Sequence, residues 1–280
     1  MYTSAFVHKK ITLFCIPGTY TDSFHPIIDG IAVQLGYENK QFAVVFDAGS
    51  TGTRVLGYQF HLGYYDGRLV LDRELFKELK PGLSSFADDT TKAAEQINQL
   101  LTNAKDFIPS ELWPATPVVL KATAGLRLLP PAKADNILNT ARETLKKSVF
   151  LMVDNAVEIM DGTDEGILSW FTVNFLLNRL GGHNTVAALD LGGGSTQVTF
   201  VPNDPSQTPS FADYMHTVPS GSSSFDVFTN SYLNLGLMAG RHAIYTHKLP
   251  SNQTDLLSDC VNPIVQNKLW QYGNVDYMVR

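Results

Sequence analysis

Apolar residues form short runs that alternate with stretches of helical spacing, and this pattern predicts strands and helices in turn. Three strand-like runs come first, at residues 42–46, 54–61 and 68–75. The first two flank a glycine-rich loop and predict a hairpin. Residues 89–107 then place apolar side chains at helical spacing, at Ala94, Ile97, Leu100, Leu101 and Ala104.

The alternation continues beyond this helix. Residues 117–120 predict a short buried strand, and residues 131–147 predict a helix with an apolar inner face. Another strand is predicted at 157–160. A helix over 165–180 follows it, and Gly181-Gly182 would terminate this helix.

Strands that alternate with helices in this way predict an α/β fold. The predicted order begins with three strands, which are followed by helix, strand, helix, strand and helix. Two new strands then begin, and this renewal suggests two similar lobes. We expect residues 41–163 to form the first lobe and 164–280 the second, after an irregular extension over 1–40. Residues 203–223 are rich in Pro, Ser and Gly and predict a loop on the second lobe.

Composition narrows the class of protein. The 280 residues are 44% hydrophobic and 17% charged, as in an ordinary folded protein. The 21 basic and 27 acidic residues give a net charge of −6 with no basic run, which argues against a nucleic-acid partner. No segment approaches the ~20 apolar residues that span a membrane. Cys15 and Cys260 are too few for a disulfide framework.

The same glycine-rich loop occurs twice at a constant offset. Residues 47–55 read DAGSTGTRV and residues 190–198 read DLGGGSTQV, each after an apolar run. The offset is 190 − 47 = 143 at the aspartates and 198 − 55 = 143 at the valines. Such loops direct backbone N–H groups and hydroxyls at phosphate oxygens. An aspartate at the strand end is suited to hold a hydrated Mg²⁺ or Ca²⁺. Two ordinary hairpins are the alternative, but they do not explain why an aspartate precedes both loops.

Glu165 is the candidate general base. It lies in the first turn of a predicted helix, where the helix N-terminus favours the ionised form that a base needs. The alternative is that it only interacts with the helix dipole. Thr123 could orient a water or a phosphate, and Arg127 could act on the substrate or pair with a carboxylate. Residue types alone leave the segment 121–127 open between a turn and a site.

Four segments are familiar in their order along the chain: FDAGSTGTR at 46–54, KATAGLRLLP at 121–130, DGTDEG at 161–166 and LDLGGGSTQ at 189–197. They resemble the first four conserved regions of the ecto-apyrases, the nucleoside triphosphate diphosphohydrolase family. The segment NSYLNLG at 230–236 is similar to a further family segment. The surroundings of Glu165 and KPGLS at 80–84 look closest to the soluble, lumenal nucleoside-diphosphatase subgroup.

This resemblance implies a two-lobed actin/hexokinase-like (ribonuclease H-like) fold. It also implies hydrolysis of nucleoside diphosphates such as UDP and GDP, more weakly of triphosphates, with Ca²⁺ or Mg²⁺. Carried over by motif, Glu165 activates the attacking water, and Thr123 and Gln197 help to place it. Asp47 and Asp190 hold the metal through water. The phosphates would be bound by Ser50, Thr51, Gly52, Arg54, Gly192, Gly193, Gly194, Ser195 and Thr196.

The resemblance also implies that the second lobe is incomplete. The last family region supplies an aromatic surface for the base and would lie after Arg280. The partner of Cys260 in a lumenal disulfide would lie there too. Family members enter the secretory pathway, so we expect a lumenal or secreted location. The sequon at Asn252 is compatible with it, although Lys9-Lys10 and the short apolar run after them make no clear signal peptide.

Two other functions remain possible from the sequence. The chain could be a catalytically inactive nucleotide-binding fragment of such an enzyme. It could also be an exopolyphosphatase or a sugar kinase, since these share twin phosphate loops. The segments AGLR at 124–127 and DGTDEG at 161–166 favour the apyrases.

Overall fold

The computed structural model describes residues 40–63, 69–177, 179–180, 184–220, 223–262, 264, 266–273 and 275–280, together with Ile31 and Leu35. The predicted extension over 1–40 therefore lies outside the described residues, apart from Ile31, Leu35 and Lys40. The predicted terminating glycines, Gly181 and Gly182, lie outside them as well.

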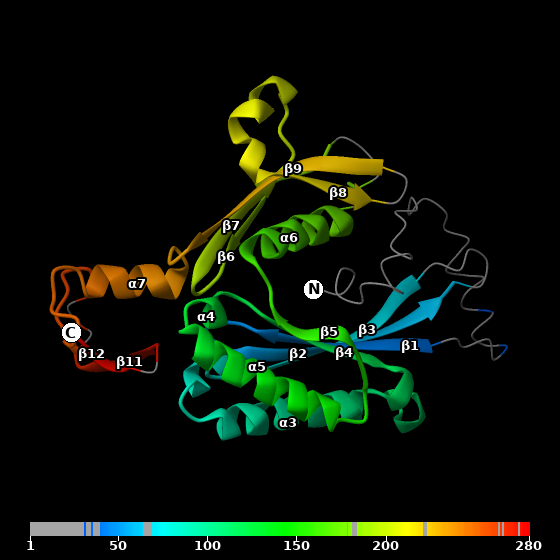
Figure 1. Ribbon diagram of the computed structural model, residues 1–280, viewed down its shortest axis with the longest axis horizontal. Helices are drawn as coiled ribbons and strands as arrows, with labels where there is room; N and C mark the ends of the chain where they lie inside the picture. Colours follow the sequence, from blue (N-terminus) through cyan, green and yellow to red (C-terminus); the bar gives the residue numbers. More distant parts are fainter. Residues whose placement is uncertain are drawn as a thin grey trace.

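The first lobe is built on a five-stranded mixed sheet (Figure 1). Its strands are β1 (Lys40–Ala48), β2 (Thr53–Leu62), β3 (Leu69–Leu79), β4 (Pro117–Ala122) and β5 (Leu151–Ile159). They lie in the order β3-β2-β1-β4-β5. The chain β1-β2-β3 is an antiparallel meander, and β4 and β5 run parallel to β1. The predicted hairpin around the first glycine-rich loop is confirmed.

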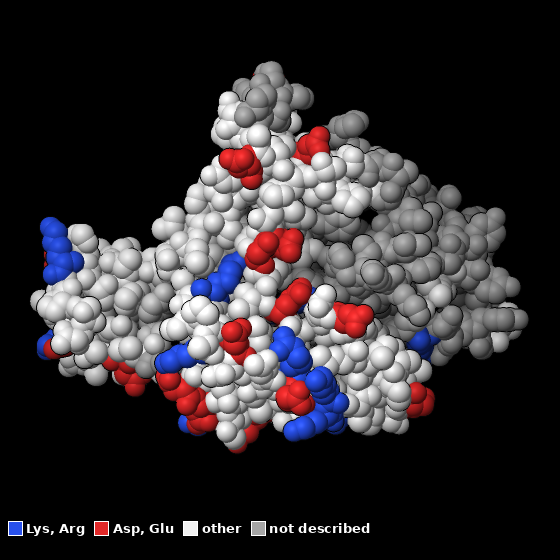
Figure 2. All heavy atoms as spheres, viewed as in Figure 1, with Lys and Arg blue, Asp and Glu red and all other residues white. Residues whose placement is uncertain are grey.

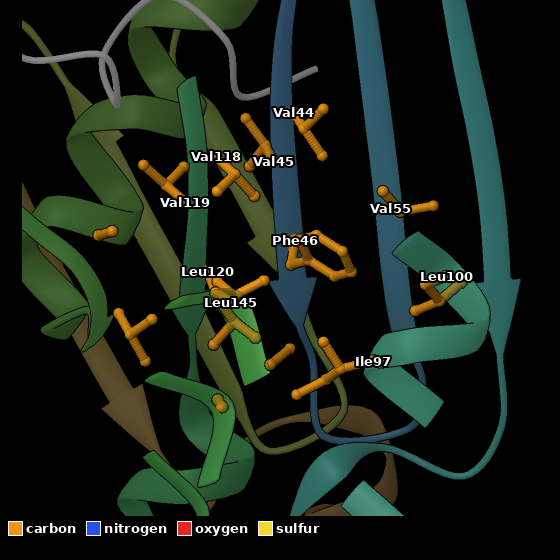
Figure 3. Close-up of a cluster of buried hydrophobic side chains, with 14 of the residues drawn as sticks. Val44, Val45, Phe46, Val55, Ile97, Leu100, Val118, Val119, Leu120 and Leu145 are labelled. Carbon is orange, nitrogen blue, oxygen red and sulfur yellow. The ribbon is translucent and has the colours of Figure 1, made fainter. Parts of the chain in front are cut away.

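Helices α3 (Thr90–Phe107) and α5 (Pro131–Lys146) pack on this sheet and on each other. Figure 3 shows the core that results, where strand side chains such as Phe46 and Leu120 meet Ile97 and Leu100 of α3 and Leu145 of α5. The short elements η1 (Leu83–Phe86), η2 (Ser110–Ala115) and α4 (Ala124–Arg127) connect the strands and helices. The apolar spacing predicted both long helices to within one residue at each end.

The second lobe has a four-stranded antiparallel sheet in the order β6-β7-β9-β8. Its strands are β6 (Ala188–Leu191), β7 (Ser195–Phe200), β8 (Met215–Ser220) and β9 (Ser223–Leu233). Helix α6 (Gly162–Leu176) packs on it and lies between the two sheets in Figure 1. Trp170 of α6 is fully buried, with its ring 5.5 Å from that of Phe225.

The predicted loop over 203–223 was wrong. This segment forms η3 (Pro205–Tyr214), strand β8 and the start of β9. Aromatic contacts explain why a segment rich in Pro and Ser is ordered. Phe228 of β9 stacks on Phe200 at 4.9 Å and contacts Phe211 and Tyr214 of η3.

Two predicted boundaries also differ from the structure. Strand β5 begins at Leu151 rather than at residue 157, because its first residues pair with β4 through an irregular register. Helix α6 begins at Gly162 and ends at Leu176, rather than covering 165–180. The Asp161 carboxylate accepts a hydrogen bond from the backbone N–H of Asp164 at 2.8 Å, which stabilises the earlier start.

A third, smaller unit follows the second sheet. It consists of α7 (Leu237–Tyr245), β10 (Asp255–Leu256), β11 (Lys268–Tyr272) and β12 (Val275–Val279). An aromatic cluster joins α7 to this sheet, since His242 stacks on Tyr272 and bonds to the hydroxyl of Tyr277. Within the described ranges, no helix is long and apolar enough to cross a bilayer.

The internal repeat extends to the pairing register. In the first lobe, Asp47 lies opposite Arg54 and Ala48 lies opposite Thr53. In the second, Asp190 lies opposite Gln197 and Leu191 lies opposite Thr196. The two hairpins therefore pair in the same register at the sequence offset of 190 − 47 = 143 residues.

Candidate active site

The two glycine-rich loops meet. A methyl group on Gly193 of the second loop would overlap the side chains of Ser50 and Thr51 in the first loop. A methyl group on Gly125, in α4, would overlap the backbone of Ser50. Glycine is therefore favoured at both positions, by close approach of first-loop side chains at Gly193 and of the Ser50 backbone at Gly125. The structure brings Ser50, Thr51 and Gly193 together, as the twin-loop interpretation requires.

Helix α7 fixes the orientation of the second loop. The backbone N–H groups of Met238 and Ala239 donate to the carbonyl of Gly193, and that of Leu237 donates to the carbonyl of Gly192. The loop also closes on itself, because the Gly192 N–H donates to the Ser195 carbonyl at 2.9 Å. The oxygen side of the loop is thus directed at the start of α7.

Glu165 lies in the first turn of α6 and is 9% exposed. Its Oε2 accepts hydrogen bonds from Arg127 Nη2 at 2.6 Å and from Gln197 Nε2 at 3.0 Å. Burial raises the pKa of Glu165, while the charge and hydrogen bond of Arg127 oppose this rise and the charges of Asp190 and Asp47 add to it. We expected the helix N-terminus to favour the ionised form, but burial outweighs the favourable contributions.

Gln197 and Ser195 complete a buried polar network around this carboxylate. Gln197 Nε2 lies 2.8 Å from Ser195 Oγ and 2.9 Å from Ser231 Oγ. Arg127 Nη2 also donates to Ser195 Oγ, at 3.2 Å. Four elements, α4, α6, β7 and β9, therefore converge on Glu165.

In the first lobe, the carboxylate of Asp47 is paired with an arginine, as that of Glu165 is. Its Oδ2 accepts a hydrogen bond from Arg54 Nη1 at 2.8 Å, and Arg54 in turn contacts Glu78. Burial raises the pKa of Asp47, the Arg54 hydrogen bond and charge lower it, and the charge of Asp190 raises it. Asp190 thus interacts electrostatically with both Asp47 and Glu165, which puts all three carboxyls in one field.

These carboxylates fit a hydrated cation rather than one fully ligated by protein. In the described part of the chain, no group of three or more His, Cys, Asp or Glu side chains is arranged to hold a metal. Mg²⁺ typically keeps several waters and takes one or two carboxylates together with substrate phosphates. Asp47 and Asp190 place carboxylate groups, which are hard oxygen donors of this kind, at corresponding strand ends.

Three more of the expected site residues, Thr123, Gly52 and Gly194, are located by their contacts. The Thr123 N–H donates to the Ala48 carbonyl, so Thr123 lies beside the first loop. Gly52 contacts the Glu78 side chain, and Gly194 contacts Ala124.

The Thr196 side chain is not brought to the network. It lies on the opposite face of β7 from the buried Ser195 and Gln197, and its hydroxyl donates to the Leu235 carbonyl at 2.7 Å.

Three further residues lie at the candidate site. The sequence left the role of one of them open and did not point to the other two. The role of Arg127 was undecided, and the structure pairs it with Glu165. Ser231 and Glu78 were not singled out, because each contributes only through its position on a third strand. Pairing register was the missing signal, because the strand predicted over 68–75 ends before Glu78, and β8 separates Ser231 of β9 from β7 in the chain.

Comparison with known proteins identifies a matching family and several relatives of this chain. The sequence model of the GDA1/CD39 (nucleoside phosphatase) family matches residues 33–280. Ectonucleoside triphosphate diphosphohydrolase 6 of Rattus norvegicus is 44% identical over 244 residues, which are 85% of this chain and 53% of that protein. Nucleoside diphosphate phosphatase ENTPD5 of Homo sapiens is 45% identical over 245 residues, which are 84% of this chain and 56% of that protein.

Among solved structures, the chain resembles the nucleoside triphosphate hydrolases of Neospora caninum, with a TM-score of 0.55 at 18% identity. That match covers 86% of this chain and 55% of the other. It supports the predicted α/β, actin/hexokinase-like fold. The chain spans about half the length of the curated relatives that it matches.

Proposed function

Because this chain belongs to the GDA1/CD39 (nucleoside phosphatase) family, we propose that it hydrolyses the terminal phosphoanhydride bond of nucleoside diphosphates. The observation that supports this most is the position of Glu165. Its buried carboxylate lies at the convergence of α6 with the second loop, and the second loop contacts the first. A base beside two loops that can bind phosphates is an arrangement suited to phosphoryl transfer to water.

In the proposed reaction, Glu165 accepts a proton from the attacking water. The water oxygen forms a bond to the terminal phosphorus, and the phosphoanhydride bond breaks to leave a nucleoside monophosphate and inorganic phosphate. The raised pKa of Glu165 suits this role, because a base works best with a pKa close to the operating pH. Gln197 and Thr123 help to place the water.

The loops bind and orient the phosphates. We assign this role to the backbone and side chains of the two loops, namely Ser50, Thr51, Gly52, Gly193, Gly194 and Ser195. Gly192 is left out because its N–H donates to the Ser195 carbonyl and its carbonyl accepts from Leu237. The Thr196 side chain is left out because its hydroxyl bonds to Leu235. Arg54 is left out because its guanidinium pairs with Asp47 and Glu78. Positioning and electrostatic stabilisation supply most of the catalysis in such reactions, without a covalent intermediate.

A divalent cation, Ca²⁺ or Mg²⁺, would be held through water by Asp47 and Asp190. When bound, it would neutralise charge on the phosphate oxygens. The mutual field of the two aspartates with Glu165 supports this assignment, because each carboxylate raises the cost of ionising another.

The substrate class rests on the relatives. One is named a nucleoside diphosphate phosphatase and others ectonucleoside triphosphate diphosphohydrolases. We therefore propose diphosphates such as UDP and GDP as preferred substrates, with weaker action on triphosphates. The prefix "ecto" in those names also supports a place in the secretory pathway lumen or outside the cell.

The test is phosphate release from UDP, GDP, ADP and ATP by the 280-residue chain. Each nucleotide is assayed with Ca²⁺, with Mg²⁺ and with a chelator, and inorganic polyphosphate serves as the control substrate. Metal-dependent release from diphosphates, with polyphosphate untouched, would support the proposal. Nucleotide binding without release would instead identify an inactive nucleotide-binding fragment.

A further inference from the structure

In the first lobe, three charged residues form a row across adjacent strands. Asp47 of β1 lies directly opposite Arg54 of β2, which lies directly opposite Glu78 of β3. Arg54 donates through Nη1 to Asp47 at 2.8 Å and through Nε to Glu78 Oε1 at 3.0 Å. Its Nη2 lies 2.9 Å from the same Glu78 oxygen. The guanidinium is thus shared between two carboxylates.

In the second lobe, the corresponding row is Asp190 of β6, Gln197 of β7 and Ser231 of β9. Gln197 again bonds to the residue on the third strand, through Nε2 to Ser231 Oγ at 2.9 Å. Space for Ser231 depends on α6, because a methyl group on Gly162 would overlap the Ser231 side chain. Ser231 is therefore enclosed between the start of α6 and Gln197.

We propose that Glu78 and Ser231 are equivalent positioning residues, each orienting the side chain that lies opposite the strand-end aspartate of its lobe. Glu78 orients Arg54 beside the proposed cation site, and Ser231 orients Gln197 beside the proposed base. The inference rests on the proposed hydrolysis. Neither residue needs to contact the substrate, since each acts through its neighbour in the row.

Glu78 controls how much of Asp47 is available to a cation. It takes the Nε and Nη2 side of the guanidinium, which leaves Arg54 a single bond to one oxygen of Asp47. Without Glu78, the same fork is free to turn and pair with both oxygens of Asp47, the geometry that Arg and carboxylates favour. Loss of Glu78 also removes a negative charge near the site. Both effects weaken cation binding.

Ser231 controls the direction of the Gln197 amide. Gln197 Nε2 has two hydrogens but three acceptors within reach, on Glu165, Ser195 and Ser231. The Ser231 bond keeps the amide nitrogen at the end of β7 that faces Glu165. Without it, both amide hydrogens are left to Glu165 and Ser195, and the amide plane turns toward these two acceptors. The water beside Glu165 is then placed less well.

The Glu78 assignment is tested with Glu78→Gln and the matched control Glu74→Gln. Both remove one charge from β3, but Glu74 lies opposite Tyr58 rather than Arg54. Calorimetric titration with Mg²⁺ and with Ca²⁺, in the absence of nucleotide, measures cation affinity directly. We expect affinity to fall roughly tenfold in Glu78→Gln, as for groups that orient a metal ligand, and to stay unchanged in Glu74→Gln. Equal affinities in the wild type and Glu78→Gln would overturn this half, as would the absence of cation binding to the wild type.

The Ser231 assignment is tested with Ser231→Ala and the control Thr217→Ala, which removes a hydroxyl bonded to Asp226 at the exposed edge of the same sheet. For Ser231→Ala we expect kcat to fall roughly tenfold with KM little changed. Hydrogen exchange of the Gln197 side-chain amide, followed by NMR, should accelerate in Ser231→Ala only. Unchanged amide exchange would overturn this half.

Failure of the row proposal is distinct from failure of the proposed function. A wild-type chain that releases no phosphate under any condition would contradict the hydrolysis. The calorimetric and amide-exchange measurements would still decide whether Glu78 and Ser231 orient their neighbours. Normal hydrolysis with unaltered affinity and exchange in both variants would refute the row proposal alone.

Discussion

Asp47 and Glu165 are buried carboxyls whose arginine partners do not fully compensate for the loss of water. In both, burial is the largest contribution and raises the pKa, while Arg54 and Arg127 oppose it. A protein gains nothing in stability from such groups at neutral pH, so they are typical of functional sites. The pH dependence of stability and of turnover should therefore report on them.

We expect Asp47→Asn to stabilise the fold at pH 7. Because folding raises the pKa of Asp47, the stability linked to its protonated form is full below the unfolded value of 3.8 and is lost as pH rises through the folded pKa. Asparagine keeps the neutral form at every pH, and Arg54 retains Glu78. Thermal unfolding should show a Tm higher by about 2 °C at pH 7, with a smaller gain at pH 4.5. The exposed Asp88→Asn is the control, and a lower Tm at pH 7 would refute the sign.

We expect Arg127→Gln to shift the acidic limb of the pH–rate profile to higher pH. Arg127 lowers the pKa of Glu165 through its charge and its hydrogen bond, so its removal lets burial raise that pKa further. Below the limb, kcat should fall about tenfold per pH unit, as for one essential base. Profiles of kcat for the wild type and the variant measure the shift. A limb that stays in place would separate Glu165 from the base role.

At the scale of elements, the sequence predicted most of the first lobe and little of the end of the second. The repeat at offset 190 − 47 = 143 placed both hairpins, and helical spacing placed α3 and α5, because these elements have one clearly apolar face. Strand β8 was missed because its order depends on contacts of η3 and β9. The motifs of the candidate site were recognised in the sequence, but Glu78 and Ser231 enter this site only through strand register.

Replacement by alanine should have opposite effects at two glycines, Gly193 and Gly240, because only the first is crowded. Gly193→Ala should separate the loops, because the new methyl group would overlap Ser50 and Thr51. Gly240→Ala, within α7, meets nothing within 4 Å and should stabilise the protein by about 0.5–1 kcal/mol. Chemical denaturation measures the second effect, and nucleotide affinity measures the first. Gly193→Ala with wild-type affinity would show that contact between the loops is not needed for binding.

At the scale of the whole molecule, the two lobes are related but unequal. Phe46 of β1 is fully buried, whereas Leu189, its counterpart on β6 at the offset 189 − 46 = 143, is 75% exposed. Strand β4 covers the edge of β1. Among the described residues, β6 has no corresponding parallel neighbour. The surface in Figure 2 carries acidic and basic side chains intermixed over the first lobe, which agrees with the absence of a basic run in the sequence.

This inequality predicts the cost of matched substitutions. Phe46→Ala should destabilise the chain by about 3–5 kcal/mol, the usual cost of emptying a phenylalanine site in a core. Leu189→Ala should cost less than about 0.5 kcal/mol, since exposed positions contribute little. Urea titrations of both variants measure the difference. Similar costs at the two positions would mean that the edge of β6 is covered in solution.

Glu165 is central to the account, and its conversion to glutamine is the most direct test. Glutamine keeps the shape and can still accept the Arg127 hydrogen bond, but it cannot take a proton from water. We expect metal-dependent phosphate release from UDP to fall by ~10² to 10⁴ in Glu165→Gln, with UDP affinity nearly unchanged and the exposed control Glu143→Gln fully active. Turnover retained in Glu165→Gln, beside an active wild type, would contradict the account.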